Sequence, residues 1–149
     1  MTTALGTVFA EIDARLSAIV NPQAGSYQRM PSGDPDAYPA LQAYDEGDEP
    51  ASEQEVSASR NDLFLTVEGY MQGSGGGPTH DAMLELHADV VFALCGDAGS
   101  NLGGLVENIE AVGQRRVAVA ELASTRRLGF AQDFRITLST RRGDPHQFA

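Results

Sequence analysis

The sequence LGFAQDFRITLST, at residues 128–140, decides the fold class. Apolar side chains alternate with polar ones along it. The apolar set is Phe130, Phe134, Ile136 and Leu138, and the polar set is Asp133, Arg135, Thr137 and Ser139. A period of two is typical of a strand with one buried face. Because parallel sheets are usually covered on both faces, this strand predicts a mostly antiparallel sheet that other elements cover on one side.

Two amphipathic helices are expected to provide that cover. The first can be capped by Thr2 or Thr3 and stops at Asn21-Pro22. Its apolar residues recur at steps of three and four: Leu5, Val8, Phe9, Ile12, Leu16, Ile19 and Val20. The second helix spans residues 80–95, and its apolar face comprises Met83, Leu84, His87, Val90, Val91, Leu94 and Cys95.

Phe92 lies on the opposite, acidic side of the second predicted helix. Asp81, Glu85 and Asp89 line that side. An aromatic side chain there is either a lone exposed residue or an anchor for a neighbouring subunit, and the sequence leaves both interpretations open.

The remaining segments predict further strands and two irregular regions. Residues 40–44 form a short strand, and residues 61–71 form a long one that is apolar on both faces, as in a central strand or one that meets another subunit. A strand follows LGGLV at 102–106; residues 115–122 have both strand and helix character, and we favour a strand paired with the final one. The tail at 141–149 is predicted to be turn-like and loose.

We therefore expect one domain over residues 1–149. It carries a long irregular arm at 22–39 and an acidic loop at 45–59, and six of the eleven residues from 45 to 55 are acidic. The single Cys95 cannot form an intrachain disulfide, and the chain shows neither a signal-peptide pattern nor an apolar run of about 20 residues. We expect synthesis in the cytoplasm and no membrane partner.

Charge excludes several functions. The formal net charge is −11, and all ten basic residues are arginine. A chain without lysine cannot use a Walker lysine, a Schiff-base lysine or the lysine of a Ser-x-x-Lys nucleophile. Its negative balance opposes tight wrapping of DNA or RNA, although DNA can still pass nearby.

No candidate chemical site is convincing, so we predict no enzyme, no cofactor and no metal. The glycine cluster at 73–77 lacks a P-loop lysine and GxGxxG spacing, which favours a flexible connection. His80 and His87 are too far apart on one helix, about 10 Å, to share a metal ion. His87 is better interpreted as a core histidine with a hydrogen-bond partner, and His80 as a residue at the start of the helix. Cys95 is better interpreted as a small buried residue than as a nucleophile, because a helix C-terminus disfavours a thiolate.

Charged residues are segregated along the sequence. Arginine doublets occupy the last third: Arg115, Arg116, Arg126, Arg127, Arg141 and Arg142. The acidic run that includes Asp45, Glu46, Asp48 and Glu49 lies in the first half. Together with Phe92, these residues are our interface candidates, because complementary surfaces on one chain can close a ring of identical copies head to tail. Scattered solubilising charge is the alternative.

The order of these segments resembles that of tail-terminator (tail-completion) proteins of bacteriophages with long, non-contractile tails. The similar segments are the amphipathic helix, the arm ending near YPALQAY, the strand RNDLFLTVEGY, the helix DAMLELHADVVFAL, LGGLVENIEAVG and the closing strand FRITLSTRRGDP. The resemblance implies an α+β fold, a mostly antiparallel sheet of four to five strands flanked by two helices, which assembles as a ring, in the family a hexamer.

The resemblance also implies a role in the virion. Such a ring would cap the tail tube at its head-proximal end, stop its elongation and join it to a head-side connector or stopper, with the genome DNA passing through its channel. Two alternatives remain: another neck component, such as a head-completion or stopper protein, and a small cytosolic enzyme or ligand-binding domain that uses the loop at 73–77 and His80.

Overall fold

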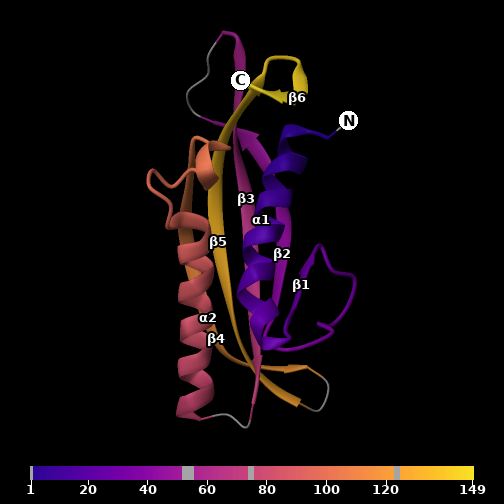
Figure 1. Cartoon of the computed structure of the whole chain (residues 1–149), viewed down its shortest axis with the longest axis vertical. Helices are drawn as coiled ribbons and strands as arrows, with labels where there is room; N and C mark the ends of the chain where they lie inside the picture. Colours follow the sequence, from indigo (N-terminus) through magenta and orange to yellow (C-terminus); the bar gives the residue numbers. More distant parts are fainter. Residues whose placement is uncertain (1, 52–55, 74–75, 123–124) are drawn as a thin grey trace.

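A computed structural model describes residues 2–51, 56–73, 76–122 and 125–149, and from 114 to 128 it describes the backbone only. The chain folds as an α+β protein with two long helices on one face of a twisted sheet (Figure 1). Both chain ends lie toward the same end of the molecule (Figure 1). The predicted fold class is confirmed.

Six strands form the sheet in the order β1-β2-β3-β5-β4, and β6 pairs with β5 off this path. Every pairing is antiparallel except that of β1 with β2, which is parallel. The strands are β1 (Ser26–Arg29), β2 (Ala40–Pro50), β3 (Ala58–Gln72), β4 (Asn108–Leu122), β5 (Thr125–Arg141) and β6 (Asp144–Phe148). The ambiguous residues 115–122 therefore continue β4, as favoured from the sequence.

The alternation along β5 sets the buried face of the sheet. Phe130, Phe134, Ile136 and Leu138 are all buried, and they belong to the same core cluster as Leu63, Leu65 and Val67 of β3. β3 is a central strand, because β2 pairs with one of its edges and β5 with the other over its full length, from Ala58 opposite Arg141 to Gln72 opposite Arg127. Both edges of β3 are therefore hydrogen-bonded, whereas Phe64 and Tyr70 on its second face are only partly buried.

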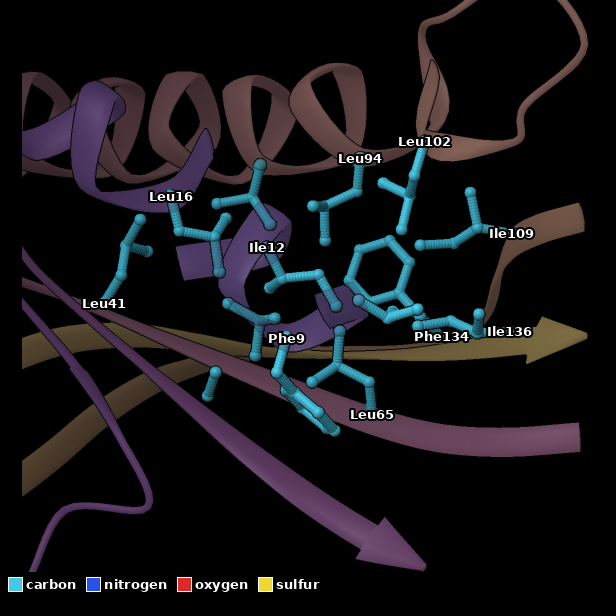
Figure 2. Close-up of a cluster of buried hydrophobic side chains, with 14 of the residues drawn as sticks. Phe9, Ile12, Leu16, Leu41, Leu65, Leu94, Leu102, Ile109, Phe134 and Ile136 are labelled. Carbon is cyan, nitrogen blue, oxygen red and sulfur yellow. The ribbon is translucent and has the colours of Figure 1, made fainter. Parts of the chain in front are cut away.

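α1 (Ala4–Val20) and α2 (Gly77–Cys95) close the core over this face. Thr3 caps α1 by accepting a hydrogen bond from the backbone N–H of Gly6, 2.9 Å away. Two short 3-10 turns, η1 (Asn21–Gln23) and η2 (Leu102–Gly104), follow the two helices. Figure 2 shows Ile12 and Leu16 of α1 and Leu94 of α2 pointing toward Leu65, Phe134 and Ile136 of the sheet. Leu86, which was not among the residues of the predicted apolar face, is buried as well.

The helices are shorter than the strands they cover. α2 has 19 residues and measures about 28 Å at 1.5 Å per residue, whereas β5 has 17 residues and measures about 55 Å at roughly 3.3 Å per residue. The ends of the sheet therefore extend beyond the helical layer, and surface features at these ends lie outside the core.

Three irregular regions predicted from the sequence are more ordered than expected. The arm at 22–39 contains β1, because Gly25 lets the chain approach Pro39 so closely that an added Cβ would lie 2.2 Å from the Pro39 carbonyl oxygen. β2 continues to Pro50, so the loop predicted from residue 45 is wrong for residues 45–50. The tail is not loose, because β6 pairs with β5 after a turn at Gly143.

Candidate functional site

Phe92 is the most exposed aromatic side chain in the described part of the chain. Its side chain is 75% exposed, because Met83, Leu86, Val90 and Leu94 occupy the inward face of α2. Open depressions flank it, one toward Arg15, Ala18 and Ile19 of α1 and one toward His87, Val91 and Cys95. Gly96 leaves room for the ring, since an added Cβ would lie 2.8 Å from it.

Acidic side chains share the outward side of α2 with Phe92. Asp81, Glu85 and Asp89 are exposed and recur every four residues, and α2 contains no arginine. We call Asp81, Glu85, Asp89 and Phe92 the Phe92 stripe. This arrangement of an apolar anchor beside uncompensated charge is suited to binding a surface that is apolar and basic.

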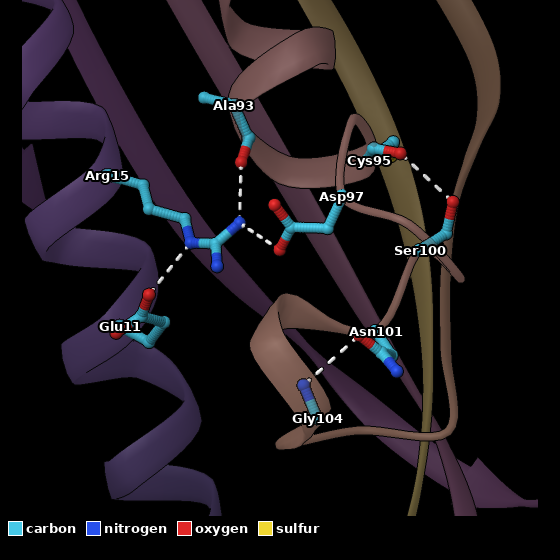
Figure 3. Close-up of polar contacts among 8 residues, drawn as sticks. All are labelled: Glu11, Arg15, Ala93, Cys95, Asp97, Ser100, Asn101 and Gly104. Atoms are coloured by element: carbon cyan, nitrogen blue, oxygen red, sulfur yellow. Dashed lines mark hydrogen bonds and ion pairs between the residues drawn. The ribbon is translucent and has the colours of Figure 1, made fainter.

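Arg15 lines the same depression as Asp89 and Phe92, and its guanidinium is already paired with other groups. Its guanidinium lies 2.8 Å from Glu11 Oε1 and 2.8 Å from Asp97 Oδ2, and it donates to the Ala93 carbonyl oxygen at 2.9 Å (Figure 3). The hydrogen bond with Glu11 raises the pKa of Arg15, which stays charged. The contact joins α1 to the last turn of α2, where carbonyl groups need donors.

The loop after α2 is fixed by two further hydrogen bonds. The Ser100 hydroxyl donates to the Cys95 carbonyl oxygen at 2.9 Å, and the Asn101 side chain accepts from Gly104 N–H at 3.1 Å (Figure 3). These bonds fix the backbone between Cys95 and η2. Leu105 and Val106, which follow η2, lie toward the end of the sheet where β6 pairs with β5.

His87 is a buried histidine with a hydrogen-bond partner, as predicted. Its Nε2 lies 2.8 Å from Gln132 Oε1, and its ring lies 4.8 Å from that of Phe130. No group of three or more His, Cys, Asp or Glu side chains in the described residues is arranged to hold a metal ion. His80 is exposed at the start of α2, far from His87 along the helix.

The Cys95 thiol is not activated as a nucleophile, and the described residues of the glycine cluster form a connection between two elements. Cys95 is half-buried, and burial raises the pKa of its thiol, which disfavours the reactive thiolate. Gly73, Gly76 and Gly77 connect β3 to α2, whereas residues 74–75 lie outside the described part of the chain. None of the described helices is both long and apolar enough to cross a membrane.

The face of the sheet that carries no helix is built from polar pairs between neighbouring strands. Thr66 donates to Asp133 at 2.8 Å, Thr137 donates to Asp62 at 2.7 Å, and Arg135 pairs with Glu110. Glu107 accepts from Arg60 and Ser139, both at 2.6 Å, and the Ser139 hydroxyl is the main cause of its lowered pKa. Among these five pairs and bonds, carboxylates outnumber arginines, so this face has an acidic character that repels phosphate groups.

The interface candidates fall at opposite ends of the molecule. Arg115, Arg116, Arg126 and Arg127 lie in the backbone of the β4–β5 ribbon, and their side chains are outside the described set. Arg141 and Arg142 lie at the other end of β5, about 50 Å along the strand from Arg126 and Arg127 at roughly 3.3 Å per residue. Arg115 and Arg116 lie opposite Ala131 and Phe130, about 35 Å from Arg141 on the same basis. The three doublets therefore do not form one basic patch.

The acidic residues of β2 lie toward the same end of the sheet as Arg141. Asp45, Glu46, Asp48 and Glu49 are exposed, and Glu49 pairs in register with Asp62, four positions from Ala58, which lies opposite Arg141. A bulge at Gly47, whose φ is +92° and whose N–H donates to Asp45 at 2.8 Å, interrupts this edge. The separation of charges along the sequence is thus only partly a separation in space.

The structure has a hollow where β6 pairs with β5, and the sequence did not predict it. It has a volume of about 300 Å³, and Leu105, Val106, Phe148 and Ala149 provide its apolar lining. Gly104, Glu107 and Ser139 complete the lining. Sequence reasoning missed this hollow because it treated the tail as loose; the apolar Phe148 near the end of a polar segment was the available signal.

Within the described residues, the fold is an α+β protein with an exposed aromatic side chain, an acidic helix side and an open apolar hollow at its surface. No protein-family model matches the chain, and no curated protein matches it. Among solved structures, it is similar to a chain in the virion of a native gene transfer agent particle. The two are 19% identical over 91% of this chain and 92% of that chain, with a TM-score of 0.41. A likeness at this level supports no conclusion about function.

Proposed function

We propose that this chain is a virion structural protein, a tail terminator that assembles as a ring on the head-proximal end of a phage-like tail. In this role it stops elongation of the tail tube and presents a surface to the head-side connector or stopper, while genome DNA passes through its channel. It is made in the host cytoplasm, acts by shape and surface complementarity, and needs no catalytic group or cofactor.

The order of the elements is the observation that carries this proposal. The resemblance implies a helix, an arm, a long strand, a second helix and a closing strand around one mostly antiparallel sheet. The structure has α1, an arm containing β1, then β2 and β3, α2, and the β4–β5 pair in one such sheet. Agreement in the order of elements and in the mostly antiparallel sheet, over the described residues between 3 and 145, supports the family assignment more than any single motif does.

Surface charge supports the proposal independently. A channel that DNA must traverse should not hold phosphate groups, and a net charge of −11 disfavours such contacts. The helix-free face carries carboxylates from Asp62, Glu107, Glu110 and Asp133 in regular cross-strand pairs. A rigid, acidic surface of this kind is compatible with DNA passing without binding.

Tube assembly tests the proposal. The chain is added at increasing concentration to the matching tail-tube protein while the tube polymerises, and tube lengths and ends are examined by electron microscopy. We expect shorter tubes with a ring at one end only, and no further growth of capped tubes when tube protein is added. Tubes that keep growing in the presence of excess chain would overturn the proposal.

The same preparation separates the alternatives. Binding to isolated head connectors without binding to tubes would indicate a head-completion or stopper protein instead. A strict monomer that binds phosphate or a nucleotide, measured by calorimetry, would indicate the ligand-binding domain that uses the loop at 73–77 and His80.

A further inference from the structure

We propose that Phe92 of one copy inserts into the hollow beside Phe148 of the next copy, and that this contact links the copies head to tail. The inference rests on the proposed function, since it names the surfaces through which the ring would close. It adds a specific pair of surfaces, neither of which follows from the resemblance.

Phe92 has the properties of an interface anchor. It is a large apolar side chain with 75% exposure on a rigid helix, and the depressions on both sides leave its ring free to enter a partner surface. α2 is held in place by the core and by the contacts of Arg15 with Ala93 and Asp97. A preorganised aromatic residue loses little entropy on binding and is a frequent hot spot.

The hollow beside Phe148 can hold an aromatic ring. Its volume is about 300 Å³, and an apolar cavity of about 150 Å³ is large enough to bind benzene. Leu105, Val106 and Phe148 supply apolar contacts, and the one carboxylate in the lining, on Glu107, is already bonded by Arg60 and Ser139. Entry of a phenyl ring therefore leaves no new charge unpaired.

Charge complementarity identifies the occupant as a second copy. The stripe around Phe92 presents Asp81, Glu85 and Asp89 on a helix that contains no arginine. Arg141 follows Thr140, which pairs with Phe148 of the lining, so Arg141 lies near the hollow, opposite Asp144. Arg142 is the next residue, and its Nη1 donates to the Val56 carbonyl oxygen at 3.0 Å. Both arginines are exposed and form no ion pair within the described residues. An acidic stripe with an aromatic anchor thus matches a basic rim around an apolar hollow.

Because the two surfaces differ, each copy can offer one and receive the other. Such a heterologous contact generates a ring when the rotation between copies closes. The hollow and the stripe contain none of the residues from 115 to 127, so the contact does not require the arginines at 115, 116, 126 and 127.

Mixing two single-surface variants tests the contact. Phe92→Ser removes the anchor, and Arg141→Glu with Arg142→Glu removes the basic rim, while both leave the core untouched. Each variant alone should be monomeric in analytical ultracentrifugation, with association weakened about 30-fold or more. A one-to-one mixture retains one intact contact per pair and should form dimers that do not grow further. Met30→Ser, a change of another exposed apolar side chain, should associate as the unchanged chain does.

A charge exchange provides the complementary test. Glu85→Arg with Asp89→Arg should abolish association in the same way as the rim variant. Combining these two changes with Arg141→Glu and Arg142→Glu in one chain should restore it.

Association that persists in Phe92→Ser, a mixture that stays monomeric, or a combined charge variant that stays monomeric would each overturn the inference. An unchanged chain that remains monomeric at all concentrations would overturn it too, while the tube assay would still decide the proposed function. An unchanged chain that stops at two copies, with either variant losing the dimer, would support the contact and overturn the ring.

Discussion

His87 Nε2 and Gln132 Oε1 lie 2.8 Å apart in the buried contact between α2 and β5. The amide nitrogen of Gln132 donates to the carbonyl oxygens of Gly113, at 2.7 Å, and of Asp133, at 2.9 Å. With both amide hydrogens used, the Oε1 atom must accept, so the His87 Nε2 atom carries a hydrogen. One side chain thereby connects the helix to the bulge at Gly113 in β4.

Gln132→Leu should destabilise the protein by about 1–3 kcal/mol. The substitution keeps an apolar volume in place but leaves the His87 N–H and the Gly113 carbonyl without their partner in a buried site. Chemical unfolding followed by circular dichroism measures the change. Gln23→Leu, at an exposed position, is the matched control and should change the unfolding free energy little; equal losses in the two variants would contradict the role assigned to Gln132.

Gly69→Ala should cost about 1–3 kcal/mol, because an added Cβ at this position would lie 2.2 Å from the ring of Phe130, its partner across β3 and β5. The displaced ring would also disturb its contact with His87, 4.8 Å away. Thermal unfolding gives the effect. Gly33→Ala meets no atom within 4 Å and has ordinary backbone geometry, so a similar loss there would show that glycine replacement in general, not this ring, is responsible.

Arg15→Gln should loosen the joint between α1 and the last turn of α2. The variant loses the contacts with Glu11, Asp97 and the Ala93 carbonyl, and we expect a cost of about 1 kcal/mol once solvent exposure is taken into account. Hydrogen exchange should speed up at residues 93–97. Arg29→Gln, which removes a longer, 3.6 Å pair with Asp13, should have a smaller effect, and protection unchanged in Arg15→Gln would contradict the assignment.

Ser139→Ala should raise the pKa of Glu107. The Ser139 hydroxyl is the largest cause of the lowered pKa of this carboxyl, followed among favourable contacts by Arg60. A carboxyl whose pKa is lowered by folding adds stability above its unfolded pKa, and this stability is lost as the pH falls through the folded-state value. The variant should therefore show a weaker decrease in stability between neutral and acidic pH. Titration by NMR measures the pKa directly, and a value unchanged by the substitution would be inconsistent with this origin.

Much of the fold could be predicted because local patterns report which face of an element is buried. The period of two in β5 and β3 and the three- and four-residue steps in α1 predicted correct elements, and Thr3, one of the two candidate caps, is the N-cap of α1. The same alternation placed Gln132 on the buried face between Phe130 and Phe134, where it is 1% exposed. Gln132 was not among the predicted functional residues, although it is the hydrogen-bond partner of His87.

The candidate site was less accessible to sequence reasoning. Phe92 was identified because one residue breaks the acidic side of a helix, which is a local feature. The hollow it is proposed to enter combines η2, β5 and β6, and no local pattern joins residues 104–107 to residue 148.

By itself, the sequence determined the two helices, the long strands, the buried face and the absence of lysine chemistry, because these depend on residue type and on spacing within one element. Only the tertiary structure decided that β1 and β6 join the sheet, that Arg126 and Arg127 lie at the opposite end of β5 from Arg141, and that Arg141 lies near an apolar hollow. The physical reason is that short edge strands and surface hollows form from backbone hydrogen bonds and contacts between distant segments, which leave little periodic signal in the segments themselves.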